Sequence, residues 1–153
     1  MALLPTVAHL RYNSLFLMGT TSAHYLSVAP LIRHRVAGAY LRIIVLSTCV
    51  SILYHACLES GVIVVGLDYL LAMVWFFYNV LFGLVTGNFV RILVCDGVIV
   101  ALNLCIPYDK NYYLVHGVWH LASAGKAYYV SHLIGSYYNE RLTGPTGPVA
   151  SYV

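Results

Sequence analysis

The stretch VIVVGLDYLLAMVWFFYNVLFGLV (residues 62–85) contains a single charged side chain, that of Asp68. A helix that crosses the hydrocarbon layer of a bilayer needs roughly 20 mostly apolar residues, and this stretch is longer than that. It therefore predicts a membrane-spanning helix. Its one carboxylate deserves a functional hypothesis, because ionisable groups inside a membrane are costly and usually serve a function.

The composition of the whole chain agrees with a membrane protein. Hydrophobic residues make up 61% of the 153 residues and charged residues only 8%, whereas a soluble domain carries roughly 25% charged residues. So few charges cannot cover a water-exposed surface, so the chain is expected to contact the lipid bilayer. The formal net charge of +3 is small and dispersed, without a basic run, and no nucleic-acid partner is expected.

Four further apolar stretches flank the first and predict an all-α, polytopic bundle of about five transmembrane helices. The expected spans are residues 13–32, 39–58, 62–85, 89–107 and 112–134. Together they define a transmembrane domain over residues 1–136. Residues 137–153 form a polar tail with Gly and Pro, for which no regular structure is expected.

The arginines predict the orientation of the bundle, because positively charged residues gather on the inner side of a membrane. Arg33 and Arg35 follow the first span, Arg91 follows the third, and Arg141 follows the fifth. This alternation places the N-terminus outside and the C-terminus inside, although Arg11 goes against it.

The predicted spans bring three histidines and Asp68 to one depth. His55 lies near the outer end of the second span, Asp68 near the outer start of the third, and His116 and His120 in the first two turns of the fifth. At 1.5 Å of rise per residue, all four fall roughly 5–10 Å below the outer surface. The spans follow from hydropathy and the orientation from arginines, so this agreement independently indicates a site.

The motif HGVWH (residues 116–120) places two imidazoles on one helix face, because residues four apart are neighbours there. In SILYH (residues 51–55), Ser51 and His55 have the same relation. Three imidazoles plus water are typical of catalytic zinc, which lowers the pKa of its water towards about 7. Asp68 could orient that water, accept its proton or ligate the metal, and Ser51 could stabilise an oxyanion. The alternative is that these are polar side chains packed between helices.

The segments SILYH, LDYL and HGVWHLASA resemble the superfamily of alkaline ceramidases, adiponectin/progestin receptors, GPI-remodelling proteins and myomaker-like proteins, over about residues 47–124. The resemblance implies that His55, His116 and His120 bind zinc, that Asp68 acts on the zinc-bound water and that Ser51 assists at the oxyanion. It also implies hydrolysis of a lipid amide or ester. The family has seven spans and five are expected here, with the missing pair falling between Asp68 and the HxxxH motif.

Two functions are compatible with these features. The first is a zinc-dependent lipid hydrolase of an endomembrane. The second is a non-catalytic subunit of a larger membrane complex, for instance in the mitochondrial inner membrane, that keeps the zinc shell as a structural element. The small size and the missing spans favour the subunit. In that case we expect a reduced substrate cavity, and partner subunits that contact apolar faces such as residues 75–78.

Two more ionisable residues, Asp96 and Lys126, fall at a shared depth below the histidines. A buried charge is stable when it has a partner, so we predict an ion pair that joins the fourth and fifth spans. His24, in the first span, has no partner that the sequence identifies.

Overall fold

The computed structural model describes residues 7–33, 38–57, 62–105 and 111–143, and these residues are helical apart from short turns, with no strand among them. The first rod of the bundle consists of three consecutive pieces: α1 (Val7–Ser22), the 3₁₀ helix η1 (Ala23–Ser27) and α2 (Val28–Arg33). The other rods are α3 (Ala39–Ala56), α4 (Val62–Thr86), α5 (Phe89–Leu104) and α6 (Tyr112–Thr143). The all-α fold class is confirmed.

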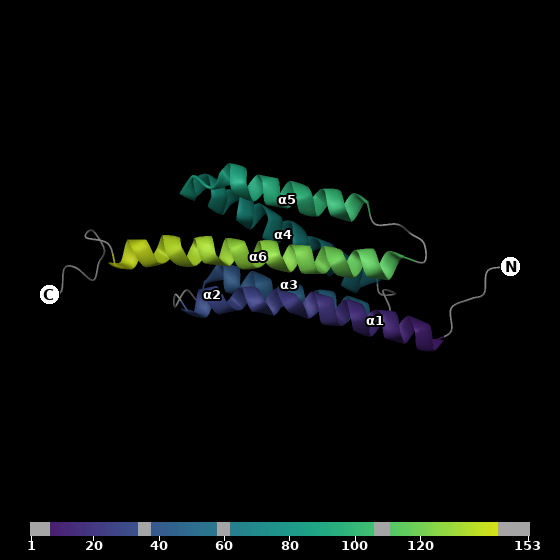
Figure 1. Ribbon diagram of the computed structural model, residues 1–153. Coiled ribbons are helices and arrows are strands. Elements are labelled where there is room, and N and C mark those ends of the chain that lie inside the picture. Colours follow the sequence, from purple (N-terminus) through teal and green to yellow (C-terminus); the bar gives the residue numbers. More distant parts are fainter. Residues whose placement is uncertain (1–6, 34–37, 58–61, 106–110, 144–153) are drawn as a thin grey trace.

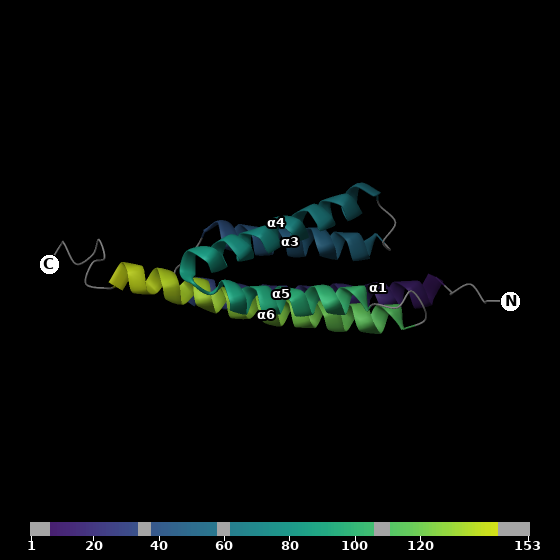
Figure 2. The ribbon, with the colours of Figure 1, turned by 90° about the horizontal axis from the view of Figure 1, so that it is seen from above.

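The rods run side by side and form two layers (Figure 1, Figure 2). One layer contains α5, α6 and the first rod, with α6 in the middle, and the other contains α3 and α4. α1 begins at one end of the bundle and α6 ends at the other. The long central helix α6 therefore contacts both α1 and α5 in its own layer.

The 3₁₀ piece in the first rod has a cause in the sequence. Pro30 lies in the first turn of α2; it has no backbone N–H, and its ring clashes with the carbonyl four residues earlier, that of Leu26. The chain responds with the tighter winding of η1, and such a segment within a helix often marks a functional position. η1 carries His24, which is buried against α6.

The turn between α4 and α5 determines how these two helices separate. Gly87 has a φ of 72°, a conformation that glycine adopts without the steric cost of a Cβ. The Asn88 side-chain amide donates to the Thr86 hydroxyl at 3.2 Å and strengthens the turn. From this turn the two helices diverge along the bundle (Figure 2).

The core contains side chains from all five rods. Trp75 donates its indole N–H to the Tyr40 hydroxyl at 3.1 Å, which joins α4 to α3. The prediction that residues 75–78 form an exposed face is wrong for Trp75, which is 8% exposed, and holds for Phe77, at 53%. The stretch is uniformly apolar, so the sequence has no period that could show which side of the helix faces inward.

Within the described residues, three helices are long and apolar enough to cross a membrane: Asn13–Arg33, Ala39–Ala56 and Val62–Thr86. α5 has 16 residues, and α6 has 32 but is more polar. The count of five spans and the orientation stay predictions. α6 continues to Thr143, so the start of the predicted tail is helical rather than irregular, while residues 144–153 lie outside the described residues.

Candidate metal centre

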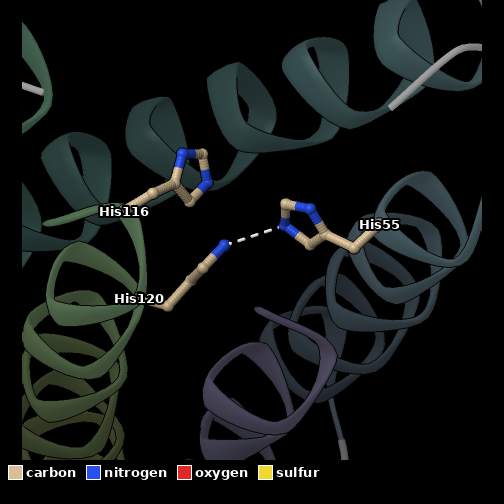
Figure 3. Close-up of side chains that lie close together, drawn as sticks. All are labelled: His55, His116 and His120. Atoms are coloured by element: carbon tan, nitrogen blue, oxygen red, sulfur yellow. Dashed lines mark hydrogen bonds between the residues drawn. The ribbon is translucent and has the colours of Figure 1, made fainter. Parts of the chain in front are cut away.

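The predicted histidines meet in the structure. His55 comes from α3, and His116 and His120 come from successive turns of α6 (Figure 3). One ligand nitrogen from each ring lies within 4.8 Å of the other two, and the Nε2 atoms of His55 and His120 are 2.9 Å apart. The three histidines that the sequence predicted at one depth therefore lie next to one another.

The distances between these nitrogens test whether a metal fits. In a tetrahedral zinc site, with Zn–N bonds of about 2.0–2.1 Å, two ligand nitrogens lie about 3.4 Å apart. The 2.9 Å contact between His55 and His120 is slightly shorter, and the largest separation within the group is up to 4.8 Å. Small rotations of the rings would bring all three to the required spacing. The three residues can thus hold a metal ion.

Neighbouring side chains restrain the positions of the histidines. Ser14 of α1 donates a hydrogen bond to the backbone carbonyl of His55. Gly117, between the two α6 histidines, packs so tightly on Phe16 that a Cβ there would lie 2.4 Å from the Phe16 ring. His55 is 1% exposed and His120 is 2% exposed. The first rod therefore holds α6 against α3 beside the histidines.

The two residues predicted to act beside the metal are also neighbours. The Ser51 hydroxyl of α3 donates a hydrogen bond to the Asp68 carboxylate of α4, and Asp68 is close enough to His55 for an electrostatic interaction. Asp68 is not a member of the group of converging ligand atoms. Of the three roles considered for Asp68, its position fits handling of a proton better than metal ligation.

A cavity of about 180 Å³ extends from this site between the two layers. At one end it is lined by Ser51, Asp68 and His120, and further along by Asp96 and Lys126. Its walls between these ends include Trp75, Phe76, Ile99, Val100 and Trp119. A cavity therefore lies beside the histidines.

His24 also lines the cavity, a position that sequence reasoning did not find. Its Nδ1 lies 2.8 Å from the Thr21 carbonyl. A carbonyl only accepts hydrogen bonds, so Nδ1 carries the proton and Nε2 remains an acceptor. The available signal was Pro30, whose disruption of the helix turns His24 towards α6 and α4, where its ring lies 5.4 Å from that of Trp75.

The predicted ion pair between the fourth and fifth spans is confirmed. The Lys126 ammonium donates to Asp96 Oδ1 at 2.6 Å, and the two side chains are 11% and 2% exposed. The second carboxylate oxygen, Asp96 Oδ2, is buried without a hydrogen-bond partner among the described residues. The pair therefore joins α5 to α6 and leaves one strong acceptor beside the cavity.

Comparisons of the chain with protein-family models, with curated proteins and with solved structures give no match. The described residues form an all-helical protein with apolar helices suited to a membrane and with a cluster of two buried histidines and one half-buried histidine that can hold a metal ion.

Proposed function

We propose that this chain is a zinc protein of the membrane interior that hydrolyses an amide or ester bond of a lipid. One observation carries the proposal: three converging imidazoles lie beside a hydrogen-bonded Ser51–Asp68 pair, at the wall of a cavity. The sequence resemblance to the ceramidase and adiponectin-receptor superfamily assigns the same five residues to this chemistry.

The nature of the ligands supports zinc. Three neutral imidazoles, without a thiolate or carboxylate in the group, suit zinc and leave a coordination position for water or substrate. Zinc in such a site supplies Lewis acidity, which polarises a carbonyl and makes water acidic near neutral pH. The protein contributes a buried, preformed set of ligands on two helices.

Asp68 is the proton carrier in this proposal. Its carboxylate accepts the proton that water loses on attacking the lipid carbonyl and delivers it to the amine or alcohol that leaves. The products are a fatty acid and that amine or alcohol. Ser51 donates its single hydroxyl proton to Asp68, so its first role in this scheme is to orient the carboxylate rather than to stabilise an oxyanion.

The substitution Asp68→Asn tests the proposal. The protein would be reconstituted into vesicles that contain a phospholipid, an acylglycerol and a ceramide, and released fatty acid would be measured by mass spectrometry. Loss of a general acid–base group should lower zinc-dependent release by about 10²-fold or more, while bound zinc stays unchanged. Ser51→Ala should give a smaller loss, and Ser136→Ala, at an exposed position of α6, should have no effect.

The outcome also separates this function from the alternative. If the wild-type protein binds zinc but releases no fatty acid from any of these lipids, the hydrolase is wrong. The zinc shell would then be a structural element of a non-catalytic membrane subunit, the other function that the sequence allows.

A further inference from the structure

We propose that the cavity binds an uncharged lipid headgroup that carries neighbouring hydroxyl groups, and that the lipid enters between α4 and α5. The site is the part of the cavity formed by Asp96, Lys126 and His24, of which His24 borders the histidine cluster, with its ring 6.1 Å from that of His120. Binding there does not depend on whether the chain hydrolyses the lipid.

The hydrogen-bonding groups of this part of the cavity determine the ligand chemistry. Asp96 Oδ2 is buried and has no partner among the described residues, and His24 Nε2 is left as an acceptor by the bond from Nδ1 to Thr21. Lys126 has three N–H donors, of which Asp96 Oδ1 takes one. A hydroxyl group both donates and accepts, so neighbouring hydroxyls can satisfy the carboxylate and the ammonium together.

The electrostatics disfavour a charged headgroup. Asp96 and Lys126 neutralise each other, and the surrounding wall includes the apolar side chains of Trp75 and Ile99. A phosphate or a quaternary amine would bring an uncompensated charge into this low-dielectric space, which is costly. Uncharged hydroxyls avoid that cost and still bind to an ionised carboxylate, where hydrogen bonds are strongest.

The shape of the cavity provides a route from the bilayer. Ala72 of α4 and Val100 of α5 line the cavity and are also exposed on the surface of the bundle. We therefore place the opening between α4 and α5. These two helices diverge from the Gly87 turn (Figure 2). The volume of about 180 Å³ suits a headgroup, because a cavity of about 150 Å³ already accommodates benzene, and the acyl chain would stay in the lipid.

Tryptophan fluorescence can report occupancy directly, because both tryptophans of the chain, Trp75 and Trp119, line the cavity. The probe is a 1-O-alkylglycerol with two bromines on the chain carbons next to the ether link, so that they lie at the mouth of the cavity when the headgroup is bound; it has two neighbouring hydroxyls and an ether link that cannot be hydrolysed. Bromine quenches tryptophan on contact. In phosphatidylcholine vesicles, we expect quenching that saturates at a lower mole fraction than with dibrominated phosphatidylcholine or dibrominated phosphatidic acid.

Two sets of variants locate the binding site. Ala72→Phe should block the opening and abolish the preference for the alkylglycerol, whereas Ala101→Phe, the same change at an exposed position of α5 outside the cavity lining, should keep it. Replacing Asp96 and Lys126 together by Leu avoids a lone buried charge. This double variant should weaken the apparent affinity about tenfold or more, because hydrogen bonds to charged groups are lost.

Three results would overturn the proposal: equal quenching by all brominated lipids, stronger quenching by a charged lipid, or a preference that survives both Ala72→Phe and the double Leu variant. Bound zinc is measured in the same samples. In the wild-type protein, absence of the lipid preference with zinc bound would refute the headgroup site alone, and absence of zinc with the preference present would refute the proposed metal function alone.

Discussion

The bundle contains two buried polar clusters that differ in what they need from outside the chain. Asp96 and Lys126 neutralise each other across 2.6 Å. The cluster of His55, His116 and His120 instead brings three nitrogen ligands of the same kind together, with no carboxylate in the group. The first cluster is balanced in charge and has one carboxylate oxygen without a hydrogen-bond partner among the described residues, whereas the second gains most from an added cation. Burying polar groups is costly in both clusters. One cluster offsets this cost with a counter-charge from the chain, and the other would offset it with a bound cation.

The largest stability effect should come from breaking the ion pair. Lys126→Met leaves the Asp96 carboxylate buried without its counter-charge, and we expect a loss of about 3–5 kcal/mol in the free energy of unfolding. Replacing both residues by Leu should cost much less, because no charge is left unpaired. Thermal unfolding in detergent measures both. A double variant that is as unstable as the single one would contradict the account of this cluster.

A smaller effect is expected where α1 supports the histidine cluster. Gly117→Ala would place a Cβ 2.4 Å from the Phe16 ring, and this 38% exposed ring would have to rotate away, which should lower the free energy of unfolding by about 1 kcal/mol and weaken zinc retention. Gly125→Ala is the matched control on the same helix, with no atom within 4 Å of the added Cβ. It should be neutral or stabilising by up to about 1 kcal/mol. Equal stability of the two variants would refute the role of this contact.

The sequence predicted well which residues lie at the same depth in the bundle. It predicted less well which side of a helix faces the core, because that depends on the rotation of the helix about its axis. Hydropathy placed the three histidines at one depth and paired Asp96 with Lys126, because rise per residue is fixed. It did not reveal that Trp75 faces the core, since an evenly apolar helix has no preferred inward side. The bend at η1 that turns His24 to the cavity also depends on tertiary packing around Pro30.

The cavity is the feature that was least predictable. It is lined by residues of all five rods, and sequence patterns within each helix do not determine how the helices are placed relative to one another. Asp68 and Ser51 were expected at the site from their positions, but their mutual hydrogen bond required α3 and α4 to be placed side by side.

The most direct test of the central claim is the zinc content of the protein, purified without chelators and measured by inductively coupled plasma mass spectrometry. We predict about one zinc per chain, as expected for a single site with these ligands, and its loss in His55→Ala and His120→Ala. His132→Ala should retain the metal, because His132 lies outside the cluster and contacts the Tyr128 hydroxyl on α6. Absence of zinc after exposure of the wild-type protein to zinc, or equal zinc in His120→Ala and His132→Ala, would contradict the metal centre.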